Sequence, residues 1–161
     1  MRRGISGCAV LAACVWLAVG AARPDFSGTW VLDKDRSYSN PAGLDQTMTI
    51  GHSGNEVKLE AKLKLAQGER TVSEVWTLDG EEREFTPPAA GSKGKRKASW
   101  LPGDRGLLVW EETVTETQKG PVTQQITRKL TLSADGKCLT VDYYSDTPRG
   151  SFESKRVFNR Q

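Results

Sequence analysis

The chain has 161 residues, 37% of them hydrophobic and 27% charged, which is enough for one domain with a single core. It carries 23 Lys and Arg against 20 Asp and Glu. Two of the basic residues, Arg2 and Arg3, lie in a predicted export signal, so the remainder is nearly neutral. A neutral domain argues against nucleic acid as the main partner.

The first 22 residues have the three parts of a secretory signal. Arg2 and Arg3 form the basic start, an apolar run covers about 10–19, and Gly20-Ala21-Ala22 supplies the small residues of a cleavage site. We therefore expect a signal peptide over 1–22 and one domain over 23–161. The expected location is the periplasm or the exterior, with no transmembrane segment.

The cysteines leave a second route of export open. Leu11-Ala12-Ala13-Cys14 has the form of a lipobox, so lipid anchoring through Cys14 is the alternative to soluble export. After removal of the signal only Cys138 remains, and one cysteine cannot form an internal disulfide. Packing must then hold the fold, and we interpret Cys138 as a buried, inert thiol.

The stretch Asp25-Phe26-Ser27-Gly28-Thr29-Trp30 opens the domain. Gly28 has no Cβ, so another backbone or a large ring can approach it closely. Trp30 has enough apolar area to plug the narrow end of a barrel. These residues are the predicted closed end of the fold.

Short segments of alternating polarity fill the rest of the chain. The clearest alternation runs over 57–65, and Asp79-Gly80 is the strongest hairpin signal. The segment 86–96, rich in Pro, Gly and Lys, is expected to be a mobile basic loop. After the opening strand, the further expected strands are 46–50, 57–65, 72–78, 81–85, 97–100, 107–116, 122–132, 138–143 and 152–158.

Short connections between these segments determine the expected topology. Sequential neighbours joined by tight turns pair antiparallel, so the chain should form an up-and-down meander of about ten strands. A meander of this length curls and closes, which removes exposed sheet edges. The predicted fold is therefore all-β, a ten-stranded antiparallel barrel without a helical segment.

The predicted inner faces supply the candidate ligand contacts. Glu74 shares a face with Trp76, and Glu112 with Trp110. Gln124 and Ser154 share the inner phase with Arg128, and because a solid core would leave such polar groups unpaired, they favour a cavity that holds water. A fully packed interior is the alternative. The aromatic candidates for the pocket lining are Trp76, Trp110, Tyr143 and Phe152, with Arg128 as a polar contact.

No catalytic or metal constellation emerges from the sequence. His52 is the single histidine and lies in a Gly-His-Ser-Gly-Asn turn, where we interpret it as a solvated residue. Without a second histidine there is no base for a serine nucleophile and no metal-ligand set. We expect no cofactor, no metal and no enzymatic activity.

Both ends of the domain resemble a known group of proteins. Phe26-Ser27-Gly28-Thr29-Trp30-Val31-Leu32-Asp33, Ser37 and Lys155-Arg156-Val157-Phe158-Asn159-Arg160-Gln161 resemble small exported lipocalin-like proteins of bacteria. Gly28-Thr29-Trp30 is also similar to the G-x-W signature of lipocalins and to the opening of fatty-acid-binding proteins. Together these families form the calycin group, whose barrels usually hold small hydrophobic molecules.

The resemblance implies roles for particular residues. An arginine near the end of lipocalin barrels packs across the G-x-W tryptophan, which implies a structural brace made by Gly28, Trp30 and Arg156. Fatty-acid-binding proteins carry Arg-x-Tyr in their last strand, where it binds the ligand carboxylate. Arg156-Val157-Phe158 keeps this arginine and lacks the tyrosine hydroxyl, so Arg156 as a ligand anchor is the alternative to the brace. The helical lid of these proteins is missing, so the mouth must either be closed by loops, for which 86–96 is the candidate, or stay open.

Two functions follow from this reading. The first is an exported, monomeric, non-enzymatic barrel that binds a small hydrophobic or amphipathic molecule in its interior. The alternative is an envelope structural or interaction module with a filled barrel and no ligand. The two differ in whether the interior contains a cavity.

Overall fold

The computed structural model describes residues 23–38, 44–66 and 68–161. The predicted signal peptide and Cys14 lie outside these residues. None of the described segments is a helix long and apolar enough to cross a bilayer. The elements are β1 (Gly28–Tyr38), β2 (Asp45–Ser53), β3 (Glu56–Leu65), β4 (Gly68–Thr77), β5 (Glu82–Phe85), β6 (Ser92–Trp100), the 3-10 turn η1 (Pro102–Asp104), β7 (Gly106–Thr117), β8 (Gly120–Leu132), β9 (Cys138–Thr147) and β10 (Gly150–Arg160).

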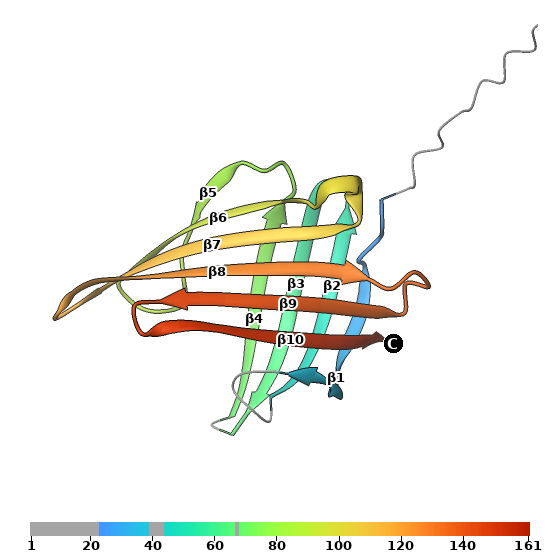
Figure 1. Ribbon diagram of the computed structural model, residues 1–161, viewed down its shortest axis with the longest axis horizontal. Helices are drawn as coiled ribbons and strands as arrows, with labels where there is room; N and C mark the ends of the chain where they lie inside the picture. The colour runs from blue at the N-terminus through green and yellow to red at the C-terminus, as the bar shows by residue number, and fades with distance from the viewer. Residues whose placement is uncertain (1–22, 39–43, 67) are drawn as a thin grey trace, which may run out of the picture.

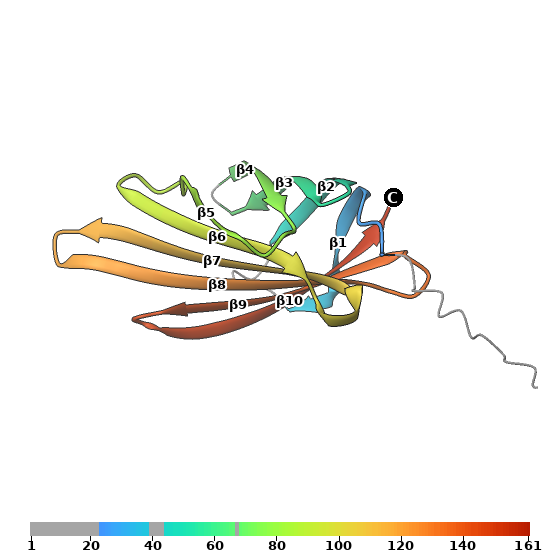
Figure 2. The same cartoon turned by 90° about the horizontal axis from the view of Figure 1, so that it is seen from above.

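All ten strands belong to one antiparallel sheet with the order β4-β3-β2-β1-β10-β9-β8-β7-β6-β5. The first and last strands pair with each other, which brings Trp30 opposite Arg160. In Figure 1, β7–β10 run across β2–β4, and Figure 2 shows β7–β10 as one curved layer with β2–β4 above it. The sheet is thus a curled half-barrel, which confirms the predicted all-β, ten-stranded antiparallel meander.

The β5–β6 hairpin is better ordered than the sequence suggested. The strand β6 begins at Ser92, so the loop predicted over 86–96 is limited to 86–91. Along β6 the exposed side chains of Lys93, Lys95 and Lys97 alternate with buried or half-buried positions. This alternation suits a strand with one wet face, and the cluster of lysines concealed it.

The closed end of the half-barrel contains three of the largest buried side chains. Phe26, Trp30 and Phe158 are fully buried there, and Trp30 Nε1 donates a hydrogen bond of 3.0 Å to the Phe26 carbonyl. Gly28 adopts φ +137°, where a side chain would be strained. A Cβ at this position would also lie 3.3 Å from the Arg160 guanidinium. These contacts seal one end of the molecule and leave the other for the cavity.

Arg160, and not Arg156, braces Trp30. The Arg160 guanidinium lies 4.4 Å from the centre of the Trp30 ring. It donates hydrogen bonds to the carbonyls of Ser27 (2.7 Å), Asp25 (3.2 Å) and Gly136 (2.9 Å). The proposed pairing of Arg156 with Trp30 is therefore wrong, because the β1–β10 register places Arg160 opposite Trp30 and Arg156 four residues further along the strand.

Two further residues differ from their sequence-based interpretation. His52 belongs to β2 rather than to a turn, and only 7% of its side chain is exposed. Its Nδ1 accepts a hydrogen bond from the Phe26 amide, so the ring fills space beside the closed end. Cys138 is partly exposed rather than buried, and its Sγ lies 3.6 Å from Arg36 Nη1, because it occupies the first position of β9 beside a turn.

Candidate ligand-binding site

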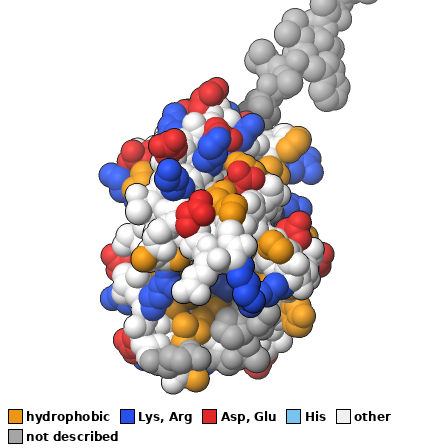
Figure 3. All heavy atoms as spheres, turned by 90° about the vertical axis from the view of Figure 1, so that its left-hand side faces the viewer, with side chains coloured by type: hydrophobic (Ala, Val, Ile, Leu, Met, Phe, Trp, Pro, Cys, Tyr) orange, Lys and Arg blue, Asp and Glu red, His pale blue; other side chains and the backbone are white. Residues whose placement is uncertain are grey.

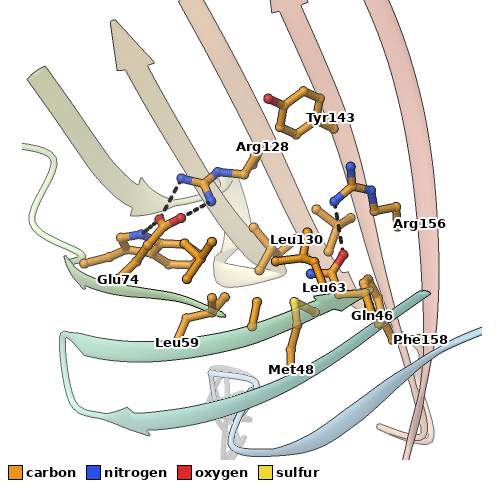
Figure 4. Close-up of a pocket in the computed structure, with 14 residues that line it drawn as sticks. Gln46, Met48, Leu59, Leu63, Glu74, Arg128, Leu130, Tyr143, Arg156 and Phe158 are labelled. Atoms are coloured by element: carbon orange, nitrogen blue, oxygen red, sulfur yellow. Dashed lines mark hydrogen bonds and ion pairs between the residues drawn. The ribbon is translucent and has the colours of Figure 1, made fainter. Parts of the chain in front are cut away.

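The interior of the half-barrel contains a cavity of about 130 Å³ (Figure 4). Strands β2, β3 and β4 line one side of it, and β8, β9 and β10 line the other. The lining is mostly apolar. Its polar members are two arginines, one glutamine, one glutamate and one tyrosine. The lining residues are Gln46, Met48, Leu59, Ala61, Leu63, Val72, Glu74, Trp76, Arg128, Leu130, Val141, Tyr143, Arg156 and Phe158.

A wider hollow of about 670 Å³ lies on the mouth side of this cavity. It is lined by the edge of β4, by Phe85 of β5 and the following residues 86–89, and by the inner faces of β7 and β8. Val72, Glu74, Arg128 and Tyr143 line both spaces, so the two hollows are adjacent. The β5–β6 loop therefore borders this hollow.

The mouth end of the molecule has a mixed surface. Figure 3 views the end that carries the β7–β8 hairpin, where basic and acidic side chains are interspersed with scattered hydrophobic ones. No area of a single charge dominates this face. A ligand that enters from this side would meet no long-range electrostatic attraction of one sign.

Four buried charges meet where β4 approaches β6, β7 and β8. Arg128 of β8 forms a bidentate pair with Glu74 of β4, with N–O distances of 3.0 and 2.9 Å, and also contacts Glu111 of β7 at 2.6 Å. Arg96 of β6 pairs with Glu111 and lies 3.2 Å from Glu74 Oε2. These side chains are 9–14% exposed. We call Glu74, Arg96, Glu111 and Arg128 the ion cluster.

The ion cluster joins the two outer parts of the sheet. Among the described residues no backbone ladder pairs β4 with β5, so the curl is not completed by main-chain hydrogen bonds. The charged side chains span this seam instead, and Trp76 Nε1 adds a hydrogen bond of 2.8 Å to Glu74. Because the cluster has two positive and two negative members, its charges balance one another.

The pKa directions agree with this internal pairing. Burial alone would raise the pKa of Glu74, but the charge and hydrogen bonds of Arg128, together with Arg96, hold it below its ordinary value of 4.5. Burial alone would lower the pKa of Arg128, yet Glu74 and Glu111 raise it. Both groups therefore stay charged at neutral pH, and Arg128 is committed to protein partners.

Arg156 has a different environment. Its Nη1 donates a hydrogen bond of 3.1 Å to Gln46 Oε1, and its guanidinium lies 5.6 Å from the centre of the Tyr143 ring. Within the described residues it forms no ion pair, and its buried Nε has no hydrogen-bond partner. Burial lowers the pKa of Arg156 below its ordinary value, as expected for a cation without a neighbouring carboxylate. Arg156 is thus a half-buried positive charge that faces the cavity.

Most of the sequence-predicted lining residues are brought together. Trp76, Arg128, Tyr143 and Arg156 all line the inner cavity. Phe152 of β10 pairs with the buried Ser145 of β9, so its side chain is on the inner face of the sheet. It lies near the beginning of β10, however, where it is 37% exposed and lines neither hollow. The prediction that Phe152 lines the pocket is therefore wrong.

Trp110 was assigned to the wrong face of its strand. On β7 the inward positions are Leu107, Val109 and Glu111, so Trp110 and Glu112 point outward. The run Leu107-Leu108-Val109-Trp110 is apolar at every position and gives no alternation from which to read a phase. Pairing decides it, since Val109 lies opposite the inward Arg128.

Sequence reasoning also missed several polar members of the site. Gln46 precedes Met48 and Ile50 by the strand period of two, a signal that would have placed it inside. Arg96 was assigned to a loop, and Glu111 was excluded by the wrong phase of β7. Their convergence on Glu74 joins strands distant in sequence, which no local pattern encodes.

Comparison with known proteins gives a likeness of fold. No family model and no curated protein matches the chain. Among solved structures, the zebrafish ileal bile acid-binding protein complexed with cholic acid matches with a TM-score of 0.50 and 12% identity, over 84% of this chain and 98% of that protein. At this identity the likeness is one of fold, and it agrees with the calycin-type barrel that the ends of the domain resemble.

Proposed function

We propose that this protein binds a small amphipathic acid inside the half-barrel and does not act as an enzyme. The observation that carries the proposal is Arg156, a cation that faces an apolar cavity and has no carboxylate partner among the described residues. A buried charge without a counter-charge is costly. An acidic group on a ligand would remove this cost, and the apolar lining would take up the rest of the molecule.

Two observations support this class of ligand. The zebrafish bile acid-binding protein shares the fold, and its structure holds cholic acid. The interior cavity favours ligand binding over the alternative of an envelope interaction module with a filled barrel. Export, directed by residues 1–22, completes the proposal and rests on the sequence of that segment. We further propose that the exported protein is a monomer.

The test compares an acid with an alcohol of the same chain length. Wild-type protein is titrated with dodecanoate and with dodecanol by isothermal calorimetry, after purification and delipidation. Replacing Arg156 with Gln should weaken dodecanoate binding about 10- to 100-fold and leave dodecanol nearly unchanged, since a hydrogen bond to a charged group contributes about 1.5 to 3 kcal/mol. Lys155→Gln, at the adjacent exposed position, is the matched control.

Each outcome bears on a distinct part of the proposal. If wild type takes up neither probe, the interior does not bind amphiphiles and the interaction-module alternative is favoured. If both probes bind but Arg156→Gln changes them equally, the cavity binds apolar chains and Arg156 is not the anchor. A bound mass in the native mass spectrum that disappears on denaturation would identify the natural ligand.

A further inference from the structure

The strand β4 is one of the two open edges of the sheet. In the described part of the chain it pairs with β3 alone, in a register that shows no shift. The other edge, β5, has four residues, and three of them are exposed and charged, which is a common way to prevent further pairing. The strand β4 has ten residues, no proline and no bulge. It is therefore the edge that can accept another strand.

The backbone groups on the open edge of β4 can be assigned. The amide of Leu78, directly after β4, donates a hydrogen bond of 2.7 Å to the carbonyl of Asn55, on the β3 side. Residues of an antiparallel strand direct their backbone groups alternately to the two sides. The N–H and C=O groups of Thr71, Ser73 and Val75 therefore point to the open edge. Their side chains are exposed, that of Val75 by 55%.

The hollow of about 670 Å³ meets the edge of β4 rather than one of its faces. Six successive residues of β4, 70–75, line it, together with 85–89 on the other side. A hollow against one face would be lined by every second residue, because side chains along a strand alternate between the two faces. Six residues give about 20 Å of open edge. An extended peptide segment of similar length would fit along it.

The charges around this hollow specify the chemistry of such a segment. The ion cluster lines the hollow, but its charges pair with one another and offer none to a partner. Arg70, near the beginning of β4, forms no ion pair within the described residues. The acidic groups beside it, Glu69 and Asp45, are paired with Lys64 and Lys34. An uncharged segment that ends in a carboxylate near Arg70 matches this arrangement.

We infer that β4 binds the extended C-terminal tail of another protein as an additional antiparallel strand. An antiparallel partner ends opposite the beginning of β4, so its terminal carboxylate lies near Arg70. Its backbone pairs with Thr71, Ser73 and Val75, and main-chain hydrogen bonds of this kind supply the affinity when a peptide adds to a sheet edge. The inner cavity stays available for an amphipathic acid, so this inference goes beyond the proposed function.

A display library of random six-residue tails with free C-termini provides the first test. Selection on the wild-type protein should enrich uncharged tails that are rich in β-branched residues. The most enriched tail is then synthesised with a fluorescent label at its N-terminus, and its binding is measured by anisotropy. Ser73→Pro removes one N–H from the open edge and leaves the pairing with β3 intact. It should weaken binding of this tail about tenfold or more.

The terminal carboxylate is tested separately. The wild-type protein should bind the same tail with a C-terminal amide about tenfold more weakly, because a hydrogen bond to a charged group is lost. Arg70→Gln should bind the two forms equally. Lys62→Gln is the matched control, since it removes one exposed positive charge from the neighbouring strand β3, and it should keep the preference of the wild type.

A second measurement blocks the same pairing from the side of the peptide. The tail is N-methylated at alternate amides in either of the two phases, and the phase that faces β4 should abolish binding. This comparison uses the wild-type protein, so it holds even where the melting temperature shows that Ser73→Pro is not folded. Equal binding of the unmodified tail and both methylated forms would overturn the inference.

The remaining outcomes separate this inference from the proposed function. No enrichment of any tail, or equal binding by the wild type and folded Ser73→Pro, would overturn strand addition at β4 and leave the amphipathic-acid proposal in place. A preference for the free carboxylate that survives Arg70→Gln would overturn the assigned direction of the tail. Binding of a tail by protein that takes up neither dodecanoate nor dodecanol would overturn the proposed function and support this inference.

Discussion

Replacing Glu74 with Gln should destabilise the protein strongly. The change keeps the shape of the side chain but removes the charge that faces Arg128 at 3.0 and 2.9 Å and Arg96 at 3.2 Å. The two arginines would then share Glu111 alone, which leaves one positive charge uncompensated at a site where the side chains are at most 14% exposed. Breaking a buried pair in this way costs about 3 to 5 kcal/mol.

Urea denaturation provides the assay. With an m-value of about 2 kcal/mol per molar, typical of a small domain, the midpoint should fall by roughly 1.5 to 2.5 M. The double variant Glu74→Leu with Arg128→Met tests the cause, because it leaves Arg96 paired with Glu111 and restores neutrality. It should recover most of the lost stability. A double variant at least as unstable as Glu74→Gln would refute the charge-balance argument and show that specific contacts of these side chains matter instead.

Three other predictions concern stability. Arg160→Ala should lower the free energy of unfolding by about 1 to 2 kcal/mol, because it removes the contact with the Trp30 ring and three hydrogen bonds to carbonyls. Denaturant titration measures this change, and an unchanged midpoint would show that Arg160 does not brace Trp30. Gly106→Ala should cost about 1 to 3 kcal/mol, since its Cβ would overlap a carbonyl oxygen of β8, whereas Gly51→Ala, with no atom within 4 Å, should cost far less. The folded-state pKa of Glu74 lies below its ordinary 4.5, so its stabilisation is complete above that pH and disappears as the pH falls through the folded value. The difference in stability between wild type and Glu74→Gln should therefore be constant near neutrality and shrink in acid; a difference independent of pH would contradict this assignment.

The strands and turns were largely predictable from sequence. Alternating polarity over 57–65 gives β3. Asp79-Gly80 gives a turn, but the hairpin predicted there is wrong, because among the described residues β4 and β5 are the opposite ends of the sheet and do not pair. The closed end was also evident, since Trp30 is fully buried as its size and the adjacent Gly28 suggested. In these places each residue has one conformational or burial preference, and neighbours along the chain agree.

The candidate site was predictable only in part. Trp76 follows Val72 and precedes Leu78 at the strand period of two, and Tyr143 follows Leu139 and Val141 in the same way, so their inward direction could be inferred. Trp110 lies in a run that is apolar on both faces, and its direction could not be inferred. Arg156 and Arg160 share one face of β10, so local pattern could not say which of them would meet Trp30.

The sequence by itself determined the number of strands, their antiparallel order and the identity of the closed end, because strand periodicity and turn chemistry are properties of neighbouring residues. Only the tertiary structure decided that Glu74, Arg96, Glu111 and Arg128 form a neutral cluster and that Arg156 meets no carboxylate in the part of the chain that the structure describes. The physical reason is that side chains from separate strands meet according to register and curl. A shift of one residue in any pairing would exchange the faces of a strand and abolish these contacts.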